Sequence, residues 1–178
     1  MTVFPALDSV PYAEAPELVA APVRAALAAD GDLAAAAHVV AIDPTLADTA
    51  ALTAAYDLPE AASANCVVVL GRRGEEERLA ACVALADSRV DVNRAVRKRL
   101  DVRKASFAPQ ERAVGETGME YGGITPVGVP ATWPVLVDER VVARDWVVLG
   151  SGLRRSKLLL PGALVGRLAG AEVGPYAA

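Results

Sequence analysis

The chain has 178 residues, of which 53% are hydrophobic, and its 22 acidic and 18 basic side chains give a formal net charge of −4. This length suits one domain with its own core, and the negative charge excludes a protein that binds nucleic acid through its overall charge. With two cysteines, no signal-peptide pattern and no apolar run of the ~20 residues that a membrane helix needs, we expect a reduced, soluble, cytoplasmic protein.

The first third of the chain predicts helices around one short strand. Apolar residues recur at helical spacing over residues 16–29, where Pro22 is expected to kink or split the helix. Residues 38–42 predict a strand, and a capped helix over residues 49–56 follows it. We expect residues 1–35 to be a helical N-terminal extension of a single domain that spans the whole chain.

The middle of the chain predicts a hairpin and two short helices. Two apolar strands, residues 66–70 and 79–85, flank a glycine-containing connection over residues 71–74. Residues 93–100 predict a basic helix with one apolar face. A proline at the start of residues 109–118 favours a second helix there.

The final third alternates three strands with a helix. The strands are predicted over residues 135–138, 146–149 and 157–160, and the helix over residues 162–168. Because helices and strands are mixed and at least one pair forms a hairpin, the sequence predicts an α+β fold with a mixed sheet.

The segment from Thr117 to Gly128, with the pattern TG-x3-GGITP-x-G, is too rich in glycine and proline for a helix or a regular strand. Its adjacent glycines, Gly122 and Gly123, would let a ligand contact bare backbone N–H and C=O groups. A plain connecting loop has the same composition, so the residues alone leave both interpretations open.

This loop, in its place between the neighbouring elements, resembles the YbaK/EbsC family of free-standing editing domains related to those of bacterial prolyl-tRNA synthetases. The resemblance rests on Gly122-x-x-x-Pro126, the apolar strand 66–70 before it and the segments 134–138 and 147–152 after it. It covers about residues 42–168. It implies a strongly curved, barrel-like mixed sheet flanked by helices.

The resemblance also implies an activity, the hydrolysis of the ester between a wrong amino acid and the 3′ end of a tRNA. The usual substrates of the family are small amino acids, such as alanine or cysteine, on a proline tRNA. No cofactor and no metal is required. The implied partners are tRNA and an aminoacyl-tRNA synthetase, with no membrane.

The catalytic groups implied are the amides of Gly122 and Gly123, which would hold the ester or the attacking water, together with Asn65. The family places a lysine where this chain has Asn65, and asparagine cannot offer a charge. Losing a charge-assisted contact costs ~1.5–3 kcal/mol, so we expect an altered binding role for Asn65. No lysine lies between Met1 and Lys98, so a shifted register does not restore one. Expected substrate-binding residues are Ile124, Thr125, Pro126, Gly128, Gly150, Ser151 and Gly152.

Two groups of basic residues are candidates for contact with tRNA. The first group is Arg94, Arg97 and Lys98, and the second is Arg154, Arg155 and Lys157. A solvated helix face is the usual explanation of such a run, and no aromatic residue is interleaved to support base stacking.

Other features have plain structural explanations. Gly150-Ser151-Gly152 could equally be a hairpin turn, and Asp138 is expected to cap the next turn. His38, in an apolar strand, is more consistent with a core histidine than with a Ser-His-Asp triad. His38, Cys66 and Cys82 offer too few ligands for zinc.

Three functions therefore stay open. The chain is an aminoacyl-tRNA deacylase, or it binds aminoacyl-RNA or nucleotides with weakened catalysis because Asn65 replaces the family lysine. The third is an unrelated α+β domain with a protein partner. Hydrolysis of mischarged tRNA separates the first two, and salt-dependent RNA binding excludes the third.

Overall fold

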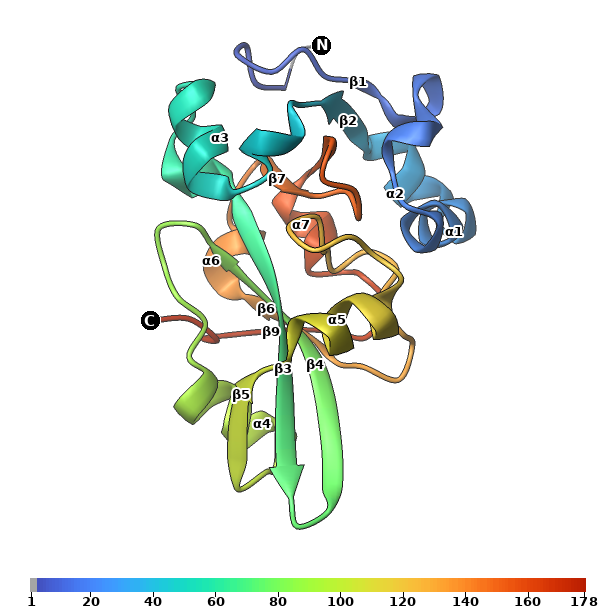
Figure 1. The fold of residues 1–178 in the computed structure, drawn as a ribbon. Helices are drawn as coiled ribbons and strands as arrows, with labels where there is room; N and C mark the ends of the chain where they lie inside the picture. Colours follow the sequence, from blue (N-terminus) through green and yellow to red (C-terminus); the bar gives the residue numbers. More distant parts are fainter. Residues whose placement is uncertain (1–2) are drawn as a thin grey trace.

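Two β-sheets form the body of the protein in the computed structural model, which describes residues 3–178 (Figure 1). The strands are β1 (Val10–Pro11), β2 (His38–Ala41), β3 (Ala64–Arg73), β4 (Glu76–Leu85), β5 (Lys104–Phe107), β6 (Val135–Asp138), β7 (Val147–Gly150), β8 (Ser156–Leu160) and β9 (Ala171–Gly174). One sheet has the order β1-β2-β8-β7 and the other the order β5-β3-β4-β6-β9.

The strand pairing confirms an α+β fold with a mixed sheet. The four-stranded sheet is antiparallel throughout. In the five-stranded sheet, β6 is parallel to both β4 and β9, and the other pairs are antiparallel. The prediction of one barrel-like sheet needs correction, because the strands divide into two sheets that meet at an isolated parallel bridge between Ser63 and Val148.

Short helices connect and cover the sheets. They are α1 (Ala21–Ala29), α2 (Gly31–Ala36), α3 (Thr49–Ala55), α4 (Arg97–Leu100), α5 (Gln110–Thr117), α6 (Glu139–Val142) and α7 (Gly162–Val165). A π-helical turn, Val92–Val96, precedes α4, and 3-10 turns occupy Tyr12–Glu14, Pro16–Leu18, Pro44–Leu46 and Glu60–Ala62. Within residues 3–178, every helix is too short or too polar to span a bilayer.

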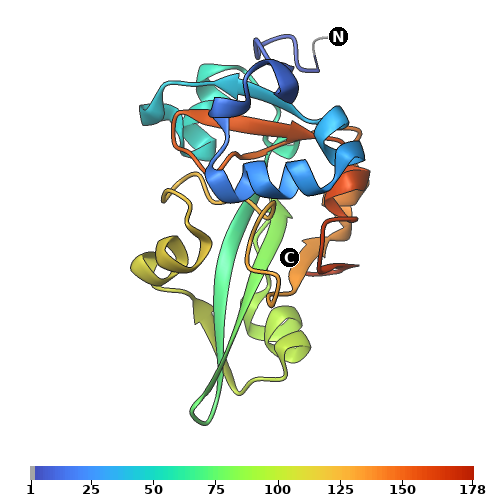
Figure 2. The same ribbon diagram turned by 90° about the vertical axis from the view of Figure 1, so that its right-hand side faces the viewer.

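The predicted helix over residues 16–29 is split in two, and the break lies at Val19 and Ala20, just before Pro22. A 3-10 turn precedes α1, and Pro22 lies in the first turn of α1, where its missing N–H is not needed. Asp30 then caps the unpredicted helix α2 by accepting a hydrogen bond from the Leu33 amide at 3.0 Å. Figure 2 shows α1 and α2 lying alongside the four-stranded sheet.

The β3–β4 hairpin is longer than predicted. β3 continues through residues 71–73, and the turn is made by Gly74 and Glu75, with Gly74 at a φ of +66°. The helix α7 ends three residues earlier than predicted, at Val165. The strands β1, β5 and β9 were not predicted, because each is short and lies at the edge of its sheet, where no alternation of apolar residues marks it.

Three hydrophobic clusters hold these elements together. The main core lies between the two sheets and α1, and the α4 core lies under the basic helix. A smaller cluster, called here the α3 core, packs α3 on the outer face of the four-stranded sheet. It consists of Leu7, Val40, Ile42, Leu52, Leu58, Val148 and Leu159.

The N-terminal segment contributes to the main core. We therefore predict that α1 folds together with the rest of the domain. Val23 and Leu27 of α1 are fully buried in that core. Leu27→Ala leaves a cavity and is expected to lower the free energy of unfolding by ~2–5 kcal/mol, measured by urea unfolding. Ala28→Ser, at an exposed position of the same helix, is the control and should change it by less than about 0.5 kcal/mol. Equal stability of the two variants would show that α1 is an independent extension.

Candidate functional site

A cavity of about 720 Å³ opens between α3, the first half of β3 and the loop over residues 117–128, which is called here the glycine loop. This volume lies within the range of ligand sites in proteins. Its walls come from residues within 45–53, 60–68, 107–113, 121–124 and 148–157, together with Ala86. Segments far apart in the sequence therefore meet around one space.

The glycine loop brings the unpaired backbone amide of Gly122 to the cavity lining. Gly122 lines the cavity, has a φ of +83°, and its amide makes no hydrogen bond within residues 3–178. Gly123 does not line it, because its amide donates to the Glu120 carbonyl at 2.9 Å and its carbonyl accepts from the Gly152 amide at 2.7 Å. The predicted pair of amide donors is therefore reduced to Gly122.

Most of the remaining loop residues face the interior instead of the cavity. Thr125 and Pro126 are buried. A Cβ added at Gly128 would lie 2.4 Å from the Pro22 carbonyl oxygen, so Gly128 packs the loop against α1. Of the predicted substrate-binding residues in this loop, only Ile124 lines the cavity. Sequence spacing located the loop but did not indicate which side faces a ligand.

The turn over residues 150–152 supports the glycine loop from behind. Gly150 lines the cavity and lies so close to the loop that an added Cβ would be 2.4 Å from the Gly123 carbonyl oxygen. Ser151 is fully buried, and its hydroxyl pairs with that of Ser156 at 2.8 Å. Gly152 packs against Ala20. Ser151 and Gly152 thus have structural contacts and lie outside the cavity lining.

Asn65 and Gly122 line the same cavity. Asn65 lies near the start of β3, where it pairs with Ala84. Its Oδ1 accepts a hydrogen bond from the Thr49 hydroxyl at 2.6 Å, which ties β3 to the first turn of α3. The side chain contributes hydrogen-bonding groups to the cavity but no charge.

Arg154 joins the glycine loop to the turn that precedes α3. Its amide donates to Glu120 Oε2 at 2.6 Å, and its guanidinium donates to the carbonyls of Tyr121 at 3.0 Å and Pro44 at 3.3 Å. Arg154 is exposed and lines the cavity. Arg155 instead donates to the Glu17 carbonyl at 2.9 Å and lies outside the lining.

Lys157 lies inside the molecule and lines the cavity, with only 6% of its surface exposed. Its Nζ donates to the Ala47 carbonyl at 2.8 Å. The pKa of Lys157 is lowered to about 8, mainly because the side chain is buried; Asp48 opposes this shift, and the nearby Arg154 adds to it. The sequence signal for this position was a lysine directly before three leucines in a predicted strand. That pattern predicts only a contact with tRNA and does not indicate a buried position.

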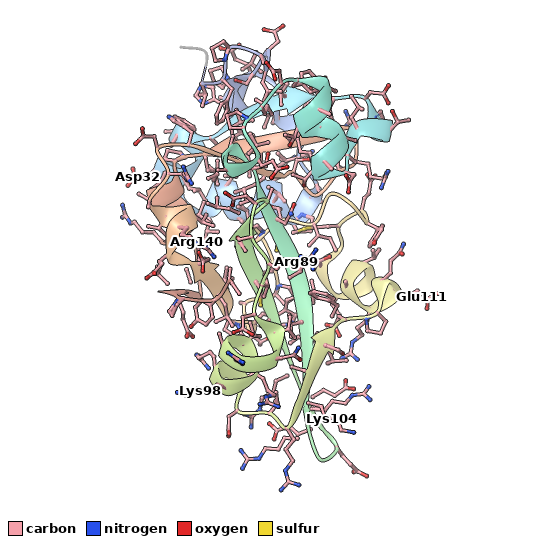
Figure 3. All side chains as sticks on the ribbon, turned by 90° about the vertical axis from the view of Figure 1, so that its left-hand side faces the viewer. Asp32, Arg89, Lys98, Lys104, Glu111 and Arg140 are labelled. Atoms are coloured by element: carbon pink, nitrogen blue, oxygen red, sulfur yellow. The ribbon has the colours of Figure 1, made fainter. Side chains whose placement is uncertain are left out.

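The other basic group is separate from the cavity. Arg94, Arg97 and Lys98 line a shallow depression beside α4 together with Asp101 and Val102. Figure 3 shows Lys98 and Lys104 in the lower half of the molecule, near the β3–β4 hairpin and β5. The structure therefore does not bring the two basic groups together.

Two exposed aromatic side chains line the cavity, and sequence analysis missed them. Phe107, at the end of β5, is 62% exposed, and Tyr121, in the glycine loop, is 55% exposed. Neither is interleaved with basic residues in the sequence. Only the fold brings them to the cavity that Arg154 also lines.

The remaining candidates have structural roles. Asp138 caps α6 by accepting from the Arg140 amide at 3.1 Å, as predicted. His38 packs edge-on against Trp146 with ring centroids 5.5 Å apart. Burial raises the pKa of the Cys66 thiol, and burial raises the pKa of Cys82 to about 12. Among residues 3–178, no three His, Cys, Asp or Glu side chains are grouped to hold a metal ion.

The fold is shared with several solved structures, whereas no curated protein sequence matches the chain. Hypothetical protein APE2540 is 22% identical, with 88% of this chain and 99% of that chain covered and a TM-score of 0.76. A protein described as a proposed trans-editing enzyme for prolyl tRNA synthetase is 20% identical, with 86% and 93% covered and a TM-score of 0.71. At these identities, the likeness shows the fold.

The family model described as the aminoacyl-tRNA editing domain matches residues 43–167. The matched segment contains α3, the glycine loop and every strand from β3 to β8. It therefore contains Asn65, Gly122 and Lys157. Because the match covers well over half of the 178 residues, the chain belongs to the aminoacyl-tRNA editing domain family, of the YbaK type that the glycine loop indicated.

Proposed function

We propose that this protein hydrolyses the ester of a mischarged tRNA that carries a small amino acid, with a proline tRNA as the first candidate. The observation that carries the proposal is a cavity of about 720 Å³ that joins a free backbone amide at Gly122 to exposed aromatic side chains at Phe107 and Tyr121. Family membership supports the editing chemistry. The likeness in fold to a proposed trans-editing enzyme for prolyl tRNA synthetase supports the choice of proline tRNA.

The reaction needs no group beyond the ester, water and the cavity. The water oxygen forms a bond to the ester carbonyl carbon, and the C–O bond to the ribose then breaks. The ribose oxygen takes up a proton, and the amino acid leaves as its free acid. The Gly122 amide is suited to hold the ester carbonyl or the attacking water, because a fixed donor needs no reorganisation when charge develops.

The cavity walls suit a nucleoside that carries a small acyl group. Phe107 and Tyr121 offer faces on which a terminal base can stack, which every base allows. Arg154 is exposed on the same lining and can meet a phosphate. Alanine side chains occupy several wall positions and leave space for the acyl group. They are Ala47, Ala50, Ala64, Ala86, Ala108 and Ala113.

The basic residues beside α4 would act at a distance from this chemistry. Arg94, Arg97 and Lys98 are exposed around the second depression and can meet the tRNA backbone. Arg155 and the residues of the turn 150–152 would support the site without touching the ester. We further propose that the chain acts as one domain, in the cytoplasm, where charged tRNA is used.

A second candidate function is the binding of aminoacyl-RNA or nucleotides without useful catalysis. It is favoured by the neutral Asn65, whose Oδ1 is already engaged by Thr49. The two functions differ in one experiment. The protein, in molar excess, is incubated with a panel of tRNAs charged with alanine, cysteine, serine or proline, and loss of the labelled amino acid is followed. Hydrolysis of at least one mischarged tRNA above buffer supports the deacylase, and binding without hydrolysis supports the second function.

The aromatic pair generates a prediction about affinity. Phe107→Ala and Tyr121→Ala should each lower kcat/KM for the hydrolysed tRNA by roughly 5- to 150-fold, because stacking of one base is worth ~1–3 kcal/mol. Val173→Ala is the matched control, since Val173 is also a large exposed apolar residue but does not line the cavity. Equal kcat/KM values for all three variants would exclude stacking at the cavity.

The α4 group generates a prediction about salt dependence. In the double variant Arg97→Ala, Lys98→Ala, the slope of log K against log salt for tRNA binding should become shallower by roughly 1 to 2, because each neutralised phosphate contributes ~0.7–0.9. Filter binding over a series of KCl concentrations measures the slope. An unchanged slope would remove α4 from the tRNA interface.

A further inference from the structure

Lys157 occupies a position where an apolar residue is expected. β8 is an inner strand of the four-stranded sheet, and all five of its residues are buried. Side chains alternate along a strand, so Lys157 and Leu159 share one face. Leu159 belongs to the α3 core, with Val40 and Leu52. A charge beside such a cluster is costly unless hydrogen bonds or an opposite charge compensate it.

The protein supplies only part of that compensation. An ammonium has three donors, and one of them bonds the Ala47 carbonyl at 2.8 Å. Within residues 3–178, no carboxylate oxygen lies within 4.0 Å of Lys157 Nζ. The remaining donors belong to a side chain that lines the cavity. They are available to an acceptor on a ligand.

The other titratable groups on the cavity lining do not neutralise Lys157. The carboxylate of Asp48 caps α3, accepting from the amides of Ala50 at 3.0 Å and Ala51 at 3.3 Å. The cation of Arg154 is held by backbone carbonyls, and Glu60 is exposed. The other two titratable groups on the lining are Cys66 and Tyr121.

Two hydroxyl groups on the same lining also lack a protein partner. Ser63 is 2% exposed, and its Oγ has no hydrogen-bond partner within residues 3–178. The same holds for Thr53 Oγ1. Buried polar groups are normally hydrogen-bonded. The cavity therefore carries a cation and two hydroxyls suited to a polar ligand.

We propose that Lys157 is a catalytic residue of this cavity, whose ammonium donates to the ester carbonyl oxygen and stabilises the negative charge that this oxygen gains when water adds. The inference rests on the proposed function. A tRNA enters a cavity with its acylated end first, so the ester reaches a side chain as buried as Lys157 and the phosphates trail towards the exposed Arg154. Because Lys157 is buried and Arg154 is exposed, we assign Lys157 to the ester and Arg154 to the phosphates.

The step balances without a proton from Lys157. As the water oxygen bonds the carbonyl carbon, the π electron pair of the carbonyl moves onto its oxygen and the added water gives up a proton to solvent. When the pair returns, the bond to the ribose oxygen breaks, and that oxygen takes a proton from solvent. Lys157 stays protonated throughout and lowers the energy of the charged intermediate.

The test compares Lys157→Met with the wild type and with Arg167→Met, which removes an exposed charge after α7, outside the cavity and outside the basic group beside α4. The substrate is the tRNA of the panel that the wild type hydrolyses fastest. Lys157→Met should lower kcat by ~100-fold or more, as loss of an oxyanion donor does. KM should change by less than about 3-fold, because the interaction forms only in the transition state. Arg167→Met should match the wild type.

The pH profile separates this role from a structural one. Because the ammonium form is required, the ratio of kcat for the wild type to kcat for Lys157→Met should fall as the pH rises through about 8. Using the ratio cancels the alkaline hydrolysis of the ester. Lys157→Met should melt no lower than the wild type at pH 7, because replacing a buried charge by an apolar side chain is often neutral or stabilising. Lys157→Gln, which keeps a donor without charge, serves if Lys157→Met does not fold.

The outcomes are distinguishable. A wild type that hydrolyses none of the mischarged tRNAs would overturn both the proposed function and this inference. An active wild type with an equally active Lys157→Met overturns the inference alone. Lys157→Met could instead lose kcat together with a lower melting temperature, while the ratio of the two kcat values does not change with pH. That result assigns Lys157 a structural role and also overturns the inference.

Discussion

The site depends on the close contact of two glycine-containing turns. The amide of Gly152 donates to the Gly123 carbonyl at 2.7 Å, and the amide of Glu120 donates to the Gly152 carbonyl at 2.9 Å. No side chain fits between the turns, since a Cβ at Gly150 would lie 2.4 Å from the Gly123 carbonyl oxygen. This pairing uses the carbonyl of Gly123, whose amide donates to Glu120 within the loop, whereas the Gly122 amide has no hydrogen-bond partner within residues 3–178. The same pairing fixes Arg154, which follows one turn and is bonded to the other.

The sequence predicted those helices and strands that are set by a few neighbouring residues. The β3–β4 hairpin, α3, α5 and the division of the first helix just before Pro22 each follow from a proline, a glycine, a capping residue or an apolar run. The division into two sheets did not follow, because it depends on which strands pair across the chain. β2 pairs with β8, more than a hundred residues later.

The loop was located from its pattern, but the side that faces the cavity was not. Thr125, Pro126 and Gly128 stand in the same pattern as Gly122, yet Thr125 and Pro126 are buried and Gly128 packs against Pro22 of α1. The partner of the loop across the cavity, Asn65, was found from the order of elements. Phe107 was missed because its exposure results from the end of a short edge strand, which carried no signal. Prediction thus failed where long-range packing decides the orientation of a side chain.

Asparagine at position 65, where the resemblance to the YbaK family implies a lysine, has an electrostatic explanation once Lys157 is taken into account. Arg154 already lowers the pKa of Lys157, and each further cation in one cavity disfavours the protonated form of the others. A lysine at position 65 would add a third positive charge to a lining that holds Lys157 and Arg154. A neutral side chain bonded to Thr49 avoids that repulsion and keeps β3 attached to α3. A neutral Asn65 is therefore compatible with a cavity whose positive charges are Lys157, on the inner strand β8 of the other sheet, and Arg154.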